Sequence, residues 1–155
     1  LLKPSVDQMH YIAHQNGLKS RMTVHENLSF WKNWLAADIS YDASRAMSCQ
    51  QALAYAGLED RMDLAAGDLS AGQKRRLSLA RLLVAPRPIW LLDEPDTALD
   101  ENGKAWLAEL MEAHKEAGGL AVVATHALLP TANMQLQLSD TSGQQKPVRA
   151  HEVTE

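Results

Sequence analysis

The sequence predicts an α/β protein built on a parallel β-sheet, and three observations lead to this prediction. Two short, continuous apolar runs at residues 89–92 and 120–124 have the pattern of strands buried in parallel sheets. A helix-like segment from Asp100 to about residue 117 lies between them and supplies the crossover that parallel strands require. The first run ends in Asp93 and Glu94, and open α/β sheets bind their ligands at this end of a strand.

The segment before these runs predicts one more strand, followed mostly by helix. Residues 9–14 read as a short strand that stops before Gln15. Thr23 and Glu26 have the spacing of a capping box, which predicts a helix from residue 24 to about residue 37. The expected apolar stripe of this helix consists of Val24, Leu28, Trp31 and Leu35.

Two aromatic residues of this helix, Phe30 and Trp34, lie outside the stripe. They could be buried between helices of the same domain. They could instead be exposed anchors for a helix of a partner protein, since aromatic side chains are enriched at such contacts. The sequence leaves both interpretations open.

A second helix is predicted from an Asp42 cap through residue 56. Gly57 suits the left-handed conformation that ends helices, and Leu58 could then pack back on Leu53. The single cysteine, Cys49, falls on the apolar stripe of this helix, so we interpret it as an inert core thiol.

The third predicted helix carries polar chemistry at its start. Ser70 and Gln73 form another capping-box pattern, and the helix runs from residue 74 to about residue 84, before two prolines. The free backbone donors at a helix start can bind an anion. Together with the acidic pair at residues 93 and 94, this helix start predicts a site for phosphate and a divalent metal.

Two further segments complete the chain. The run at residues 120–124 is predicted to be a second buried strand, and Thr125 and His126 follow it. Residues 134–138 alternate in polarity like an edge strand, and the polar segment from Ser139 is expected to be a loose tail. His10 and His14 would share a face of the first strand, but the absence of a nearby Cys, Asp or Glu disfavours a metal pair.

Composition narrows the functional class. The 155 residues fit one domain, with 46% hydrophobic and 22% charged residues. The net charge of −4 argues against a nucleic-acid partner. No apolar run approaches the roughly 20 residues that span a bilayer, and no secretory signal is visible, so we expect a cytoplasmic protein. The chain begins Leu1-Leu2-Lys3, from which we expect a fragment.

Three motifs give the chain a family resemblance. Residues 69–73, Leu-Ser-Ala-Gly-Gln, resemble the signature of the ATP-binding-cassette ATPases, with Ala71 in place of a glycine. Residues 89–94 resemble the Walker B strand of that family, and residues 97–100, Thr-Ala-Leu-Asp, are similar to its D-loop. The order and spacing of the three motifs are highly specific.

The resemblance implies a P-loop NTPase fold of the cassette type, in which a parallel RecA-like sheet carries an inserted α-helical subdomain. It divides one incomplete domain into sheet core (1–16 and 86–138), helical subdomain (17–85) and loose tail (139–155). The phosphate loop Gly-x-x-x-x-Gly-Lys-Ser/Thr does not occur in the sequence. In the family it precedes the Q-loop, so we expect it upstream of Leu1.

The resemblance also implies a role for each site residue, with ATP and Mg²⁺ as ligands. Asp93 would hold Mg²⁺ through water, and Glu94 would be the catalytic base. His126 would be the switch histidine at the γ-phosphate, and Gln15 would be the Q-loop residue that contacts metal and water. The residues expected to bind ATP in the signature and D-loop are Ser70, Gly72, Gln73 and Asp100.

Within the family, residues 11–19 and 23–28 resemble the haem-exporter ATPases of cytochrome c biogenesis. This implies an ATPase homodimer that powers transmembrane subunits from the cytoplasmic face of the bacterial inner membrane, as a peripheral subunit. Two alternatives stay open: a non-catalytic cassette fragment that only docks on membrane subunits, or the ATPase of another small exporter. A DNA-repair cassette is disfavoured by the short helical insertion and the acidic charge.

Overall fold

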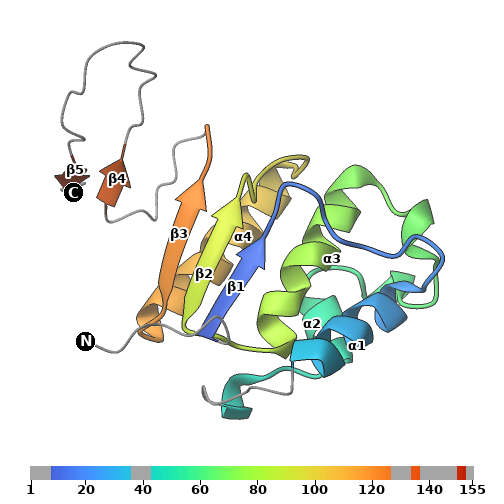
Figure 1. Cartoon of the computed structure of the whole chain (residues 1–155). Coiled ribbons are helices and arrows are strands. Elements are labelled where there is room, and N and C mark those ends of the chain that lie inside the picture. Colours follow the sequence, from blue (N-terminus) through green and yellow to red (C-terminus); the bar gives the residue numbers. More distant parts are fainter. Residues whose placement is uncertain (1–7, 36–42, 127–133, 137–149, 153–155) are drawn as a thin grey trace.

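The centre of the fold is a three-stranded parallel sheet (Figure 1). The computed structural model describes residues 8–35, 43–126, 134–136 and 150–152. Strands β1 (Met9–Ile12), β2 (Ile89–Asp93) and β3 (Leu120–Ala124) lie in the order β1-β2-β3, so the strand with the acidic end is central. The prediction of a parallel sheet formed by these segments is confirmed.

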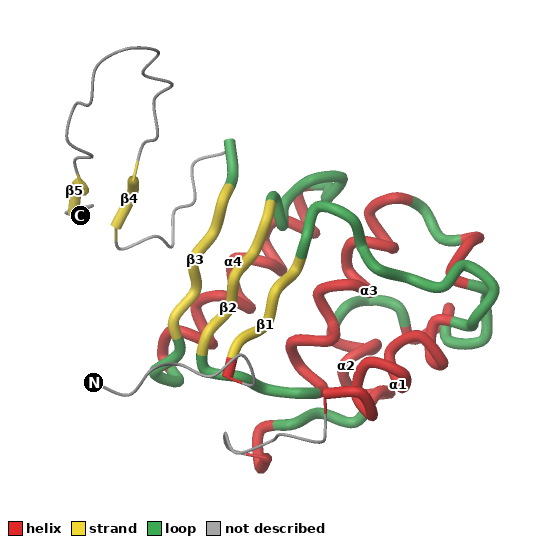
Figure 2. The backbone as a smooth tube through the Cα atoms, viewed as in Figure 1, coloured by secondary structure: helices red, strands yellow, loops and turns green. Residues whose placement is uncertain are grey.

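The helices pack on this sheet and on one another (Figure 2). Helices α1 (Val24–Leu35), α2 (Cys49–Tyr55) and α3 (Ala71–Val84) lie between β1 and β2 in the chain, and α4 (Glu101–Glu116) lies between β2 and β3. Helix α3 contacts β1, α4 contacts β3, and α1 and α2 pack against α3. Short 3₁₀ turns occur at Ala43–Arg45, Glu59–Arg61 and Ala66–Asp68.

Two predicted capping boxes are confirmed by reciprocal hydrogen bonds, although α3 begins at Ala71 and not at the predicted residue 74. At α1, the Glu26 amide donates to Thr23 Oγ1 at 3.1 Å, and the Thr23 amide donates to Glu26 Oε2 at 2.8 Å. At α3, the Gln73 amide donates to Ser70 Oγ at 3.2 Å, and the Ser70 amide donates to Gln73 Oε1 at 2.9 Å. Each cap satisfies backbone groups that the first helical turn leaves unpaired.

The predicted start of the second helix is wrong. Helix α2 begins at Cys49, because Ser48 and Gln51 form a capping box there. Asp42 itself lies outside the described residues. The predicted end is confirmed: Gly57 has φ +68°, and the Leu58 amide donates to the Leu53 carbonyl at 2.8 Å.

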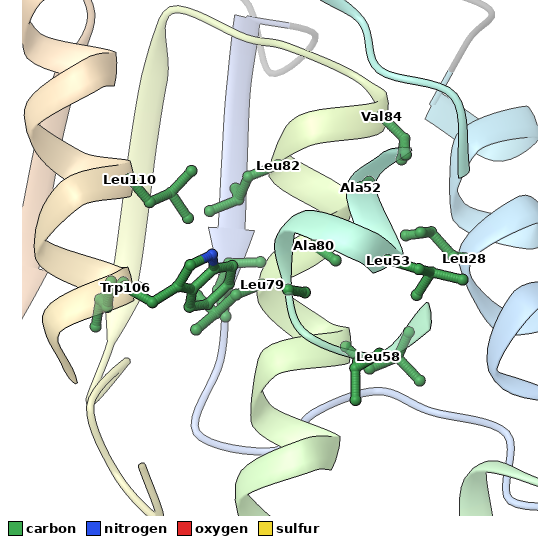
Figure 3. Packing of buried hydrophobic residues seen from close by; sticks show 14 of the residues in the cluster. Leu28, Ala52, Leu53, Leu58, Leu79, Ala80, Leu82, Val84, Trp106 and Leu110 are labelled. Carbon is green, nitrogen blue, oxygen red and sulfur yellow. The ribbon is translucent and has the colours of Figure 1, made fainter. Parts of the chain in front are cut away.

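The hydrophobic core lies between one face of the sheet and the helices. Ile12 and Leu92 of the strands are buried, and Figure 3 shows side chains of α3 and α4 packed together with those of α1 and α2. In α1, Val24 and Leu28 are fully buried as predicted, whereas Trp31 is only half-buried. The labelled core residues in Figure 3 are Leu28, Ala52, Leu53, Leu58, Leu79, Ala80, Leu82, Val84, Trp106 and Leu110.

The opposite face of the sheet is largely open. Tyr11, Leu91 and Val122 lie side by side in register, and Tyr11 and Val122 are 62% and 54% exposed. We expected a strand buried on both faces at residues 120–124, and this expectation is wrong, since Leu120 is 57% exposed as well. Side chains alternate between the faces of a strand, and α3 and α4 cover only the other face.

A second, two-stranded antiparallel sheet pairs β4 (Met134–Leu136) with β5 (Ala150–Glu152). The predicted edge strand at residues 134–138 is present in its described part. The loose tail expected from Ser139 instead contains β5. No helix in the described part of the chain is long and apolar enough to cross a membrane.

Candidate functional site

Glu94 occupies a strained position directly after the central strand. Its φ is +45°, in the left-handed region that residues other than glycine rarely adopt. Such a conformation is unfavourable by about 1–3 kcal/mol and persists only where surrounding contacts impose it. One such contact is the Glu94 amide, which donates to the Ala124 carbonyl at the end of β3, at 2.7 Å.

The Glu94 carboxylate is held between two imidazoles. His126 Nε2 lies 3.1 Å from Oε1, and His14 Nδ1 lies 3.3 Å from Oε2. The Thr97 hydroxyl also donates to Oε2, at 3.2 Å. The side chain of Glu94 is 30% exposed, so solvent still reaches a carboxylate whose two oxygens are both engaged. The structure thus brings Glu94 and His126 together.

His14 was not predicted to belong to this site. It follows β1, and its neighbour Gln15 is exposed at the same edge of the sheet. His10 is instead buried in β1, where its Nε2 donates to the Ala85 carbonyl, so the two histidines do not face each other. The described residues contain no cluster of His, Cys, Asp or Glu that could by itself hold a metal.

Asp93 is the last residue of β2, in register with Ala124. Strand alternation places its side chain on the open face of the sheet, the face of Leu91 and Val122. Mg²⁺ prefers oxygen ligands and is commonly bound by one or two carboxylates, with water and substrate phosphates completing its shell. The carboxylate of Asp93 and the exposed amide of Gln15 fit such an ion.

The start of α3 retains donors for an anion after its own cap has formed. The capping box uses acceptor atoms, the hydroxyl oxygen of Ser70 and the amide oxygen of Gln73. The Ser70 O–H and the Gln73 NH₂ group therefore remain available as donors, next to the backbone amides of the first turn. This arrangement can bind a phosphate.

Gly72 lies against the loop that follows β2. A Cβ at this position would be 2.8 Å from the carbonyl oxygen of Ala98, so only glycine permits this approach. Ala98 itself has φ +66°. The signature and the D-loop segment therefore contact each other closely within one chain.

Asp100 caps α4 and joins it to α3. Its Oδ1 accepts from the Gly103 amide at 2.8 Å and from Arg76 Nη2 at 2.9 Å. The hydrogen bond from Gly103, followed by the contact with Arg76, lowers the pKa of the Asp100 carboxyl. This carboxylate oxygen is therefore engaged within the chain. The predicted contact of Asp100 with ATP stays a prediction.

Arg75 is a buried residue that the sequence analysis missed. It is 2% exposed and donates hydrogen bonds to backbone carbonyls at the ends of both β1 and β2. Burial lowers the pKa of its guanidinium, while the charges of Asp93, Asp96 and Glu94 oppose this shift. Its position on the same helical stripe as Leu79 and Leu82 signals an inward side chain, although its partners could not be read from the sequence.

Comparison with known proteins identifies the family. A family described as ABC transporter matches residues 2–97, which include the signature and the end of β2. The chain belongs to the ABC transporter family. The ABC fold is supported by a solved structure, "Dimeric structure of a post-hydrolysis state of the ATP-binding cassette MJ0796 bound to ADP and Pi". That structure superposes with a TM-score of 0.76 at 26% identity, covering 96% of this chain and 64% of that chain.

Curated relatives within the ABC family are proteins named "Cytochrome c biogenesis ATP-binding export protein CcmA". The one from Nitrobacter hamburgensis is 46% identical over 138 residues, covering 88% of this chain and 65% of the relative. The one from Rhodopseudomonas palustris is 47% identical over 132 residues, covering 85% of this chain and 62% of the relative. The chain therefore spans less than two thirds of the length of these relatives.

Proposed function

We propose that this chain is part of the ATP-hydrolysing subunit of an ABC exporter that moves haem for cytochrome c maturation. Membership of the ABC transporter family and the names of its CcmA relatives support the transport function. The observation that carries the enzymatic part is the Glu94 carboxylate, held by His14 and His126 at the end of the central strand.

Glu94 would act as the general base. A carboxylate that is partly exposed at a strand end can accept a proton from an attacking water. His126, at the other side of the same carboxylate, would contact the γ-phosphate. Phosphoryl transfer depends mainly on positioning and charge stabilisation, which the fixed backbone of Glu94 favours.

Asp93 and Gln15 would hold Mg²⁺. When bound, Mg²⁺ neutralises charge that develops on the phosphate oxygens. Asp93 would hold the ion through water from the open face of the sheet, and the exposed Gln15 would approach metal and water from the loop after β1. Both residues lie at the same edge of the sheet as Glu94.

The signature residues would serve a second subunit. Ser70, Gly72 and Gln73 would bind the γ-phosphate held by the partner, and Asp100 would contact ATP from the D-loop. A homodimer of ATPase subunits is supported by the similar cassette, which was solved as a dimer bound to ADP and Pi. Such a dimer would work with transmembrane subunits, as a peripheral protein on the cytoplasmic face of the bacterial inner membrane.

The test of this function is Glu94→Gln in the intact subunit. The amide keeps the shape of the side chain but cannot accept a proton, so we expect phosphate release to fall by about 10²–10⁴-fold. Nucleotide binding, measured by calorimetry, should persist, and the ATP-bound protein should elute as a dimer in size-exclusion chromatography. Glu101→Gln, an exposed change in the first turn of α4, is the matched control and should hydrolyse ATP normally.

Two results would argue for other functions. Turnover at the wild-type rate in Glu94→Gln would show that Glu94 is not the base. A wild-type subunit that co-purifies with its membrane partner but never hydrolyses ATP would instead support a non-catalytic docking module.

A further inference from the structure

One guanidinium, that of Arg75, holds three consecutive carbonyls at the end of β2. Its Nε donates to the Pro95 carbonyl at 3.2 Å. Its Nη2 donates to the carbonyls of Asp93 and Glu94, both at 2.7 Å. These bonds surround the backbone of the proposed general base.

The same guanidinium holds the segment on either side of Gln15. Nη1 of Arg75 donates to the Ala13 carbonyl at 2.8 Å and to Asn16 Oδ1 at 3.2 Å. Nη1 also donates to the His14 carbonyl, at 3.5 Å. Every N–H-bearing nitrogen of the guanidinium is thus engaged, and the acceptors come from two separate loops. Because a guanidinium is planar and its donors point in fixed directions, it fixes these two loops relative to each other.

The convergence of three carbonyls explains the strained backbone of Glu94. In an extended strand, successive carbonyls point to opposite sides. The φ of +45° at Glu94 turns the chain so that the carbonyls of Asp93, Glu94 and Pro95 all face Arg75. Without the guanidinium, each of these carbonyls would lose a donor, although the Glu94 carbonyl would keep the Thr97 amide at 3.1 Å, and the contact that favours the turn would be lost.

We propose that Arg75 is a positioning residue for ATP hydrolysis, which fixes Glu94 and the Gln15 segment relative to the signature helix. This inference rests on the proposed ATPase function. Arg75 belongs to α3, the helix that Ser70 caps and that includes Gln73, so a shift of α3 on binding a phosphate moves the donors that hold Glu94. The hydrogen bonds of Arg75 therefore couple the signature to the catalytic base within one subunit.

The experiment compares Arg75→Lys and Arg75→Met with the wild-type intact subunit. A lysine keeps the charge but has fewer donors and cannot span both loops, and a methionine removes all of them. We expect kcat to fall by about 10²-fold in Arg75→Met, as for a misplaced catalytic group, while KM for Mg-ATP stays nearly constant. Arg75→Lys, which is less disruptive to folding, should show a smaller loss of kcat in the same direction.

Arg87→Met is the matched control. Arg87 also donates to a carbonyl of β1, that of Met9 at 2.9 Å, but at the end of the strand remote from Glu94. The Arg87→Met variant should keep the wild-type kcat. A kcat loss in Arg87→Met equal to that of the Arg75 variants would overturn the proposal, as would a wild-type kcat in both Arg75 variants.

Amide hydrogen exchange gives a second readout that does not depend on activity. In Arg75→Lys, exchange should accelerate in peptides covering residues 13–17 and 93–99, and remain unchanged across α1. Uniform acceleration over the whole chain, or none, would contradict a positioning role. If the wild-type subunit failed to hydrolyse ATP, the proposed function would fail, while the exchange pattern would still decide whether Arg75 fixes the two loops.

Discussion

His10 shows how one buried side chain makes the fold sensitive to acid. It is 3% exposed on the covered face of β1, and its Nε2 donates to the Ala85 carbonyl. Burial, opposed only in part by that hydrogen bond, lowers its pKa to about 4. Nearby, His114 stacks on Trp90 with ring centroids 3.6 Å apart, and burial lowers its pKa too. Both imidazoles are therefore neutral in the folded protein near pH 7.

We predict that the free energy of unfolding falls as the pH drops from about 6.5 to 4. In the unfolded state His10 binds a proton with its ordinary pKa near 6.5, whereas in the folded state it binds one only near pH 4. Stability that is present above pH 6.5 is therefore lost as the pH falls toward 4. His10 alone accounts for about 3 kcal/mol, at roughly 1.4 kcal/mol per pKa unit.

Urea unfolding between pH 7 and pH 4 measures this loss. The control is His10→Gln, whose amide can still donate to Ala85 but does not titrate. Its stability should decline less steeply with acid than that of the wild type. Parallel pH profiles for the two proteins would exclude His10 as the cause.

The sequence predicted those site residues whose side-chain type and position after a strand together indicate the chemistry. Glu94 and His126 each follow a recognisable strand, and parallel strands place their carboxyl ends at one edge of the sheet. His14 also follows such a strand, but its contact with Glu94 depends on the register of β1 against β2, which the sequence does not reveal. The side chain of Arg75 could be predicted to point inward, but its six separate backbone and side-chain acceptors could not be predicted.

At the scale of helices and strands, local sequence signals predicted the ends of helices better than they predicted which face of a strand is covered. Capping boxes at Thr23 and Ser70 predicted two helix starts, because the cap involves only neighbouring residues. The start of α2 differs from the prediction because Ser48, and not an acidic residue further upstream, provides the cap. The exposure of β3 could not be predicted at all, since it depends on which elements cover each face of the sheet.

Helix α1 presents an aromatic patch, defined by Phe30 and Trp34, away from the core. Trp34 is 70% exposed, and its ring stacks on that of Phe30 with centroids 6.2 Å apart. The ammonium group of Lys19 lies 3.8 Å from the Phe30 centroid. Of the two interpretations left open by the sequence, burial between helices does not apply to Trp34. The patch lies on the helical subdomain, close in sequence to Gln15 of the Q-loop. We propose that it helps line a groove between the two that receives a cytoplasmic helix of the membrane subunit.

We predict that Trp34→Glu abolishes co-purification with the membrane subunit. The substitution would place the negative charge of a glutamate in the apolar contact with that subunit. The free energy of unfolding should change by less than about 1 kcal/mol, because position 34 is exposed. Asn33→Glu adds the same charge one position away and should leave the complex intact. A large loss of stability in Trp34→Glu would make Trp34 a core residue instead.

At the scale of the whole molecule, the described sheet is covered by helices on one face only. Parallel sheets in α/β proteins have both faces covered, yet Tyr11, Leu120 and Val122 are more than half exposed. Asp93 points to this open face. The 155 residues also contain no phosphate loop, whose backbone amides and lysine hold the phosphates in related ATPases.

We therefore predict that these 155 residues alone bind Mg-ATP more weakly than micromolar. The signature can donate hydrogen bonds to a phosphate, but no loop surrounds it, and the charges of Asp93 and Glu94 repel a nucleotide that lacks its metal. Calorimetric titration with Mg-ATP measures the affinity, and the whole CcmA relative from Nitrobacter hamburgensis, titrated under the same conditions, is the control. Micromolar binding by the 155-residue chain would mean that these residues form a nucleotide site without a phosphate loop.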